Sequence, residues 1–185
     1  TALTRKIGLG IMGFADLLIH LGIPYNSDEA LAIAEELMSF IQTQAHEAST
    51  QLARERGVFP AYRGSRLQSR RQRWRNATVT TIAPTGTISI IADCSAGIEP
   101  LYGIHLVRTV MDGMTLSRLH PAFARHVETH GLALPSLQRE LEQCASIQHL
   151  TQLPASLRQL FITAHDVSPS HHVRMQAAFQ RHSDS

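Results

Sequence analysis

The chain has 185 residues, and its 43% hydrophobic content is enough for a buried core and too high for a disordered tail. Its 17 lysines and arginines nearly balance its 15 aspartates and glutamates, which argues against a general nucleic-acid-binding protein. The longest apolar stretch, residues 11–23, is too interrupted and short to span a membrane, and no leader sequence is recognisable, so a cytoplasmic protein is expected. Cys94 and Cys144 lie far apart, which excludes a disulfide scaffold.

The first part of the chain predicts two helices and a loop. Residues 4–21 carry apolar side chains at helical spacing, and the glycines within residues 8–13 suggest close packing of the backbone against a neighbour. Ser27 is a suitable N-cap for a second, long helix that ends near Arg56. Residues 57–76 show no periodicity and carry six arginines, so an exposed loop is expected.

The remainder predicts two short strands among helices. Residues 77–83 are rich in β-branched side chains and predict a strand, and residues 104–111 predict a second strand closed by Asp112-Gly113. Two strands cannot form a stable sheet alone, so partner strands from elsewhere are expected. The further helices are expected at residues 115–130, 136–144, 155–160 and 170–182.

The most informative local pattern is the strand followed by the turn Pro84-Thr85-Gly86-Thr87 and a helix that begins near Ile88. Glycine lets a ligand approach the backbone closely, and a helix N-terminus directs free N–H groups at an anion. Thr85, Thr87 and Ser89 add hydroxyl donors, and the absence of lysine excludes a Walker-type loop. The segment predicts phosphate binding through amides and hydroxyls, although an ordinary capped turn gives the same pattern.

Three separated segments carry a family resemblance. They read RKIGLGIMGFADLL at residues 5–18, RNATVTTIAPTGTISIIA with CSAGIEP at residues 75–100, and TAHDVSP with RMQAAFQ at residues 163–180. In this order they resemble the large chain of adenosylcobalamin-dependent (class II) ribonucleotide reductases, over essentially the whole sequence.

The resemblance implies a ten-stranded α/β barrel with a central finger loop, of which this chain would be a helix-rich α/β fragment. It implies reduction of ribonucleotides to 2′-deoxyribonucleotides by a cysteine thiyl radical that adenosylcobalamin generates. The implied partners are a ribonucleoside diphosphate or triphosphate, the remaining part of the reductase chain and a possible homodimer, with no nucleic acid and no membrane. The residues that the family uses to hold the substrate phosphates correspond to Pro84, Thr85, Gly86, Thr87, Ile88 and Ser89.

The resemblance also indicates what this chain lacks. The family's radical cysteine lies before the matched region and its reducing cysteine pair lies after it, so no catalytic or metal-binding residue is expected here. We expect a fragment that is inactive alone. It would form a single domain over residues 1–185, with helical residues 1–56, the Arg-rich loop 57–76, strands and the phosphate loop in 77–113, and helical residues 114–185. Asp93 stands where a small residue is expected.

Two alternative functions stay open. Residues 8–13 match the GxGxxG pattern of NAD-dependent dehydrogenases, but only seven residues precede Gly8, and the acids at the required distance, Asp28 and Glu29, open a helix. The second alternative is a non-catalytic interaction or regulatory module, derived from the enzyme, that would fold alone and bind a partner chain.

Several polar residues are given structural rather than functional roles. The Arg-rich loop with Trp74 is expected to be solvated rather than bound to nucleic acid. Cys94 is expected to be a small buried side chain, since no sequence neighbour would lower its pKa. His165 and Asp166 are expected to cap or pack the following helix. Solvated faces are expected, rather than metal ligands, for the pairs His171–His172 and His126–His130.

Overall fold

The computed structural model describes residues 2–109 and 115–185. These residues form two compact units. Unit 1 contains Thr1–Ile11, Leu31–Pro84 and Arg174–Ser185, and unit 2 contains Met12–Ala30 and Thr85–Val173. Among the described residues, every helix is too short or too polar to cross a lipid bilayer.

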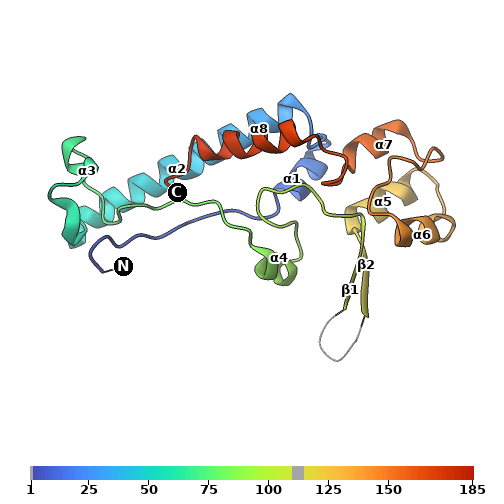
Figure 1. The fold of residues 1–185 in the computed structure, drawn as a ribbon, viewed down its shortest axis with the longest axis horizontal. Helices are drawn as coiled ribbons and strands as arrows, with labels where there is room; N and C mark the ends of the chain where they lie inside the picture. The colour runs from blue at the N-terminus through green and yellow to red at the C-terminus, as the bar shows by residue number, and fades with distance from the viewer. Residues whose placement is uncertain (1, 110–114) are drawn as a thin grey trace. The chain divides into compact units, whose positions relative to one another are not determined.

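The expected helix-rich architecture is confirmed (Figure 1). One two-stranded antiparallel sheet, β1–β2, is present within the described residues. The elements in chain order are α1 (Phe14–Leu21), α2 (Asp28–Arg56), the 3₁₀ turn η1 (Pro60–Tyr62), α3 (Arg66–Ser69), α4 (Gly86–Ala92), β1 (His105–Thr109), β2 (Thr115–Leu119), α5 (Pro121–Thr129), α6 (Leu134–Gln143), α7 (Ala155–Leu160) and α8 (Pro169–Gln180).

The first predicted helix is too long, because only its second half is helical. The residues ahead of α1 are not helical, and Leu9 among them forms a parallel bridge with Thr80. The Leu9 N–H donates to the Val79 carbonyl at 2.7 Å, and the Thr81 N–H donates to the Leu9 carbonyl at 2.9 Å. Three glycines within six residues weaken the helix there, so pairing with the extended segment around Thr80 prevails. The predicted strand at residues 77–83 is therefore extended, with Thr80 as its one bridged residue among those described.

The glycines ahead of α1 serve the close packing that the sequence predicts. A Cβ built on Gly8 would lie 2.5 Å from Thr81 Cγ2, and one built on Gly10 would lie 2.9 Å from the Thr81 carbonyl oxygen. Two extended backbones can approach this closely only where one of them has no side chain. Thr81 therefore fills the space beside Gly8 and Gly10, the first two glycines of the GxGxxG pattern.

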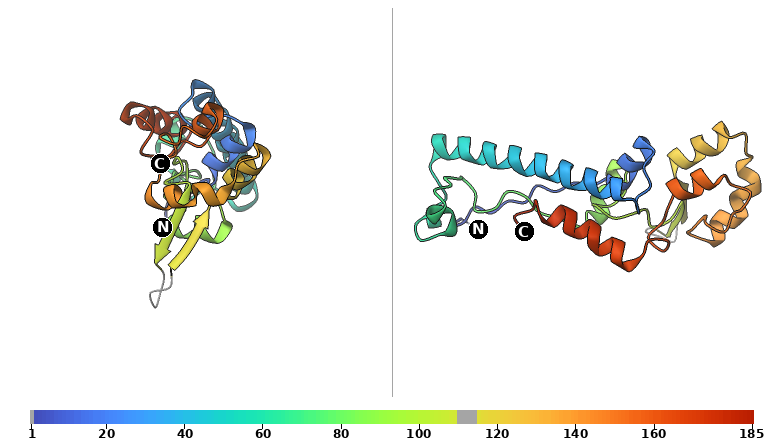
Figure 2. Two further views of the ribbon diagram at one scale, coloured as in Figure 1. Left: turned by 90° about the vertical axis from the view of Figure 1, so that its right-hand side faces the viewer. Right: turned by 90° about the horizontal axis from the view of Figure 1, so that it is seen from above.

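The second predicted helix is confirmed in full. Figure 2 shows α2 as one unbroken helix. The Ser27 Oγ accepts a hydrogen bond from the Ala30 N–H at 3.1 Å, which makes Ser27 the N-cap, and Gly57 follows the helix with a φ of 78°. The loop after α2 contains the short elements η1 and α3. Its exposed arginines, as expected for a solvated loop, are Arg63, Arg66, Arg70, Arg71 and Arg73.

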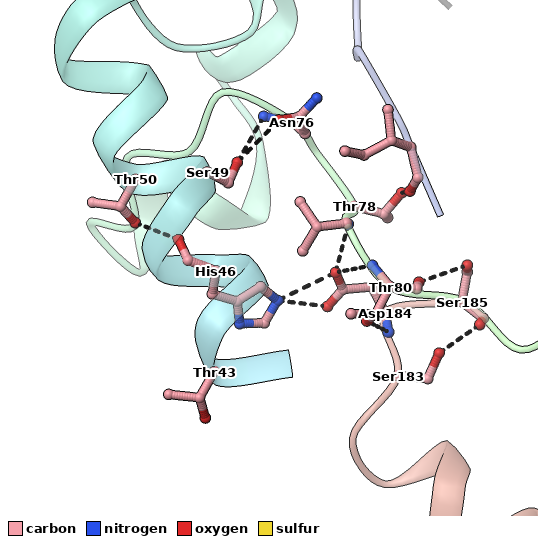
Figure 3. A network of polar contacts seen from close by, with 12 residues as sticks. Thr43, His46, Ser49, Thr50, Asn76, Thr78, Thr80, Ser183, Asp184 and Ser185 are labelled. Carbon is pink, nitrogen blue, oxygen red and sulfur yellow. Dashed lines mark hydrogen bonds and ion pairs between the residues drawn. The ribbon is translucent and has the colours of Figure 1, made fainter. Parts of the chain in front are cut away.

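A carboxylate near the C-terminus ties unit 1 together (Figure 3). Asp184 accepts hydrogen bonds from the Val79 N–H at 2.7 Å and the Thr80 N–H at 3.3 Å, and its other oxygen lies 3.0 Å from His46 Nε2 on α2. The His46 ring stacks on Trp74, with ring centroids 4.0 Å apart. One side chain thus binds the extended segment, α2 and the end of the chain to one another.

In unit 2, a hairpin replaces the start of the predicted helix 115–130. β1 and β2 are antiparallel and pair from His105 with Leu119 to Thr109 with Thr115. β2, with the sequence TLSRL, lacks a clear alternation of apolar and polar residues and becomes a strand through its pairing with β1, and the helix proper, α5, starts only at Pro121. The predicted strand 104–111 is confirmed as β1 within the described residues, and the predicted Asp112-Gly113 turn lies outside them.

The remaining helices of unit 2 surround an aromatic core. The rings of Phe123 on α5 and Phe161 after α7 meet edge to face, with centroids 5.2 Å apart, and both side chains are fully buried. Leu137 on α6 is also buried. The predicted helices 136–144, 155–160 and 170–182 are confirmed as α6, α7 and α8, with small shifts at their ends.

The close approach at Gly10 yields a first prediction. The substitution Gly10→Ala places a methyl group against the Thr81 carbonyl, and a backbone atom cannot rotate away, so we expect a loss of about 1–3 kcal/mol in the free energy of unfolding. Urea denaturation followed by circular dichroism measures the change. The control is Gly86→Ala, where no described heavy atom lies within 4 Å of the new Cβ. Equal stabilities of both variants and the wild type would contradict the packing argument.

The hydrogen bonds of Asp184 yield a second prediction. Asp184→Asn removes a charged acceptor from two backbone N–H groups, so we expect a destabilisation of about 1–3 kcal/mol by urea denaturation. Glu36→Gln removes one negative charge from an exposed position on α2, and there the free energy of unfolding should stay within about 0.5 kcal/mol. An equal loss of unfolding free energy in both variants would mean that the net charge, and not the hydrogen bonds of Asp184, causes the destabilisation.

Candidate functional site

The residues predicted to bind phosphate lie at the turn into α4 and in its first turn. We call residues 84–89 the candidate phosphate loop. Thr85 precedes the first turn of α4 and has a φ of 52°, in the left-handed region. This backbone conformation is rare for a β-branched residue, because its Cβ crowds the backbone. Strain of this kind persists only where neighbouring contacts hold it, so the contacts of Thr85 decide the shape of the loop.

The three hydroxyl groups of the loop have different environments. Thr85 Oγ1 accepts a hydrogen bond from the Gly97 N–H at 2.7 Å, which leaves its own O–H to donate elsewhere. The Ser89 side chain is only 4% exposed, and its hydroxyl donates to the Gly86 carbonyl at 3.0 Å. Thr87 is exposed. Ser89 therefore stabilises the loop through its bond to Gly86, while Thr85 and Thr87 have hydroxyls that a ligand can use.

The backbone at the start of α4 is accessible. Within the described residues, Thr85 makes no side-chain capping bond to α4, and no heavy atom lies within 4 Å of a Cβ built on Gly86. The first N–H groups of a helix have no partner inside the helix. An anion in the open space beside Gly86 would meet these donors, as the sequence predicts. Ile88 is half exposed, and Ile91 at the far end of α4 is 81% exposed.

A second segment contacts this loop through hydrogen bonds. We call residues 94–98 the exit segment, because it follows α4. The Cys94 N–H donates to the Ser89 carbonyl at 3.0 Å, the Gly13 N–H donates to the Ser95 carbonyl at 2.8 Å, and the Tyr25 hydroxyl donates to the Ile98 carbonyl at 2.7 Å. The exit segment is thus held by α4 at one end and by the region around α1 along its length.

Asp16 on α1 makes the central contact with the exit segment. Its Oδ2 accepts the Ser95 N–H at 2.5 Å, and its Oδ1 lies 2.9 Å from Nε2 of His120. Burial alone would raise the pKa of Asp16, but the hydrogen bonds from His120 and Ser95 outweigh burial and lower it below its usual value. Asp16 is therefore ionised near neutral pH, and His120 Nε2 must carry the proton that it shares with the carboxylate. Neither residue was predicted from the sequence to have a role.

Cys94 is not a reactive thiol in this environment. Burial and the Asp16 carboxylate both raise the pKa of its thiol, which keeps it protonated and weakly nucleophilic. Its Cβ lies 3.3 Å from the position of a Cβ on Gly13, so it packs against a glycine. The side chain is half-buried rather than fully buried as predicted, and its packing role is confirmed.

Among the described contacts, Ser168 and not Asp166 caps the following helix, α8, because the Ser168 Oγ accepts a hydrogen bond from the His171 N–H at 3.3 Å; Asp166 bonds to residues that precede it. The Asp166 carboxylate accepts hydrogen bonds from the Thr163 N–H at 2.9 Å and from the Ser146 hydroxyl at 2.6 Å. His165 packs edge to face on Tyr102. No group of three metal-ligating side chains gathers within the described residues.

The solvated position predicted for His171 is wrong. His171 is 6% exposed, and its Nε2 lies 3.0 Å from the Tyr25 carbonyl oxygen. The helical spacing from His171 to the buried Met175 and Ala178 on α8 is the signal that could have placed His171 on the buried face. Burial raises the pKa of the Tyr25 hydroxyl far above its usual value, so Tyr25 acts as a structural donor.

The contacts of Asp16 predict a pH dependence of stability. Because folding lowers its pKa, Asp16 stabilises the fold above the unfolded-state value near 3.8, and this stabilisation is lost as the pH falls through the folded-state pKa. Asp16→Asn should lower the free energy of unfolding by about 1–3 kcal/mol near neutral pH. Urea denaturation from about pH 7 down to about pH 3 should show the gap to wild type closing in acid. A gap that is constant with pH would contradict this account.

Comparisons with known proteins identify the family. The sequence matches the family described as "Ribonucleotide reductase, barrel domain" over residues 1–74 and 68–185. The vitamin B12-dependent ribonucleoside-diphosphate reductase of Thermoplasma acidophilum is 49% identical over 100% of this chain and 24% of its own length. The corresponding Mycobacterium tuberculosis protein is 49% identical over 97% of this chain and 26% of its own length. The chain thus spans about a quarter of the length of these curated relatives.

The fold agrees with a solved member of the same group. The class Id ribonucleotide reductase alpha subunit of Actinobacillus ureae matches 99% of this chain and 32% of its own chain, with a TM-score of 0.81 and 24% sequence identity. The dehydrogenase alternative is thereby overturned, since the whole sequence, the GxGxxG segment included, falls within the family match. The chain belongs to the ribonucleotide reductase family and corresponds to part of its barrel domain.

Proposed function

We propose that this chain is part of the catalytic chain of a vitamin B12-dependent ribonucleotide reductase, and that the candidate phosphate loop holds the phosphates of the substrate. The observation that carries the proposal is the left-handed Thr85 followed by the open Gly86, in a chain 49% identical to reductases of this kind. The relatives' names specify ribonucleoside diphosphates, so we infer a diphosphate substrate.

The loop would bind phosphate through neutral donors. The first backbone N–H groups of α4 have no partner within the helix and would be available to a phosphate in the open space beside Gly86, and the hydroxyl protons of Thr85 and Thr87 would add directional hydrogen bonds. Each contact of a charged group with a helix N-terminus contributes about 0.3–2 kcal/mol. Several such contacts orient a diphosphate, and orientation of the substrate is what this chain contributes to the reaction.

The cofactor of the relatives has no binding residues that we can assign here. Vitamin B12 in the relatives' names implies adenosylcobalamin, which supplies the radical in the whole enzyme. Within the described residues, the two histidines with a buried, unpartnered Nδ1 are His105 and His120, and their Nε2 atoms already contact Ser117 and Asp16. These residues do not fit a cobalt ligand, so none is assigned.

Gly86→Ala tests the proposal directly. The new methyl group meets no described protein atom within 4 Å, so the fold should persist, but it would occupy the space proposed for the phosphate. We expect at least a tenfold loss in ADP affinity, or about 1.4 kcal/mol, measured by NMR titration of the backbone amides of this chain. In the wild type, ADP should shift the amides of residues 85–89.

Two controls sharpen this test. Thr129→Val changes a similar exposed threonine on α5 and should leave ADP binding unchanged. NADH should cause no shift at residues 8–13, where Thr81 already packs on Gly8 and Gly10. ADP shifts outside residues 84–89, or equal ADP affinity of Gly86→Ala and the wild type, would refute the proposed role of the loop.

A further inference from the structure

The strained conformation of Thr85 depends on one hydrogen bond from the exit segment. Gly97 donates to Thr85 Oγ1 at 2.7 Å, twelve residues further along the chain. A left-handed threonine needs such a contact, because its backbone alone favours other conformations. The position of Gly97 therefore sets the position of the first residue of the loop that can contact a phosphate.

The position of Gly97 depends in turn on α1. The Phe14 N–H contacts the Gly97 carbonyl at 3.5 Å, and the Gly13 N–H donates to the Ser95 carbonyl at 2.8 Å. Asp16 adds the shortest of these contacts, 2.5 Å from its Oδ2 to the Ser95 nitrogen, while its own N–H lies 3.4 Å from Ser95 Oγ. The two residues are therefore joined in both directions, side chain to backbone.

Asp16 is itself held in place by the base of the hairpin. His120 lies between β2 and α5, and its N–H donates to the Ile104 carbonyl at 2.9 Å. Its ring packs edge to face on the buried Phe161, and its Nε2 donates to Asp16 Oδ1 at 2.9 Å. A ring fixed on both sides keeps the carboxylate in one rotamer, so that Oδ2 faces Ser95.

We propose that Asp16 is a positioning residue for the candidate phosphate loop, acting through the exit segment and the Gly97–Thr85 hydrogen bond. This inference rests on the proposed function. It adds to the loop a residue, Asp16, that lies on another helix, α1. His120 orients Asp16, and Asp16 sets the geometry of Thr85.

The chemistry of the contact requires a carboxylate at position 16. Both groups that face it, the Ser95 N–H and His120 Nε2–H, are donors, so both side-chain oxygens must accept. Asparagine has the same shape but turns an NH₂ donor toward one of these two donors. His120 could accept from that NH₂ only as its other tautomer, whose Nδ1–H would be buried without a partner among the described residues, so Asp16→Asn weakens this contact without changing the volume of the side chain.

The first measurement is amide hydrogen exchange in the free chain. In Asp16→Asn the Gly97 N–H should exchange at least about tenfold faster than in the wild type, because its bond to Thr85 opens more often. Glu128→Gln, which removes a negative charge from an exposed position on α5, should leave this rate unchanged. Unchanged exchange in Asp16→Asn would overturn the proposal whether or not the loop binds phosphate.

The second measurement is ADP affinity in a double-mutant cycle. Asp16→Asn should weaken ADP binding by about tenfold or more, and His120→Gln by a smaller factor. Glycine adopts a left-handed conformation without strain, so in a Thr85→Gly background Asp16→Asn should change the affinity less than about twofold. A merely structural role for Asp16 would produce the same loss in both backgrounds, and that result would refute the positioning role.

The two proposals fail differently. If the wild-type chain shows no ADP-induced shift at residues 84–89, the proposed function fails, and the Gly97 exchange rate still decides whether Asp16 holds the loop. If the wild type binds ADP and Asp16→Asn binds it equally well, the positioning role fails, and the phosphate loop stands.

Discussion

The structure depends on one constraint: extended backbone needs hydrogen-bond partners, and the residues that the structure describes include few strands to supply them. Aspartate side chains supply many of these partners instead. Asp184 accepts the N–H groups of Val79 and Thr80 in unit 1. In unit 2, Asp16 accepts the N–H of Ser95 and Asp166 that of Thr163. A carboxylate accepts several hydrogen bonds at once and binds a backbone N–H more strongly than a neutral acceptor does, which suits the N–H groups that the isolated bridges leave unpaired.

This use of aspartates explains how a strained loop can be stable. The left-handed Thr85 costs free energy, of the order of 1–2 kcal/mol, which surrounding contacts must offset. Its hydrogen bond to Gly97 is one such contact, and the Asp16 carboxylate fixes the segment that provides it. The strain lies at the start of the candidate phosphate loop, and the stabilising contacts come from the exit segment and from α1. Rigid support of this kind reduces the ordering that a ligand would otherwise have to impose.

Local patterns in the sequence predicted the local parts of the fold. α2 and α7 were predicted because their spacing, caps and flanking residues agree on a helix. The segment ahead of α1 was wrongly predicted as helical, because its apolar spacing fits a helix, while Leu9 within it pairs with Thr80, some seventy residues away. β2 was missed for the same reason, since its strand character depends on pairing with β1. Contacts between distant segments decide both cases, and periodicity carries no information about them.

The same limit applies to the candidate site. Residues 84–89 were found because their strand, turn and helix are contiguous in sequence, and the family resemblance then gave them a role. Asp16 and His120 were missed because they are 104 positions apart and neither lies in a motif that implies the other. Ser89 shows a subtler limit: its hydroxyl was expected to face a ligand, but it is buried and bonded to Gly86. The sequence shows that a hydroxyl donor is present at position 89, but only the fold shows where that hydroxyl points.

The neutral character of the loop has a consequence for binding. No lysine or arginine lies within residues 84–89, so a phosphate there would be bound by dipoles and hydroxyls and not by a full opposite charge. Such contacts are strongly directional and individually weak, so their sum depends on geometry more than on ionic strength. If the loop binds a diphosphate as proposed, its affinity would fall steeply when one donor moves. That sensitivity is the physical reason for proposing that Asp16, which does not touch the loop's proposed ligand, influences its binding.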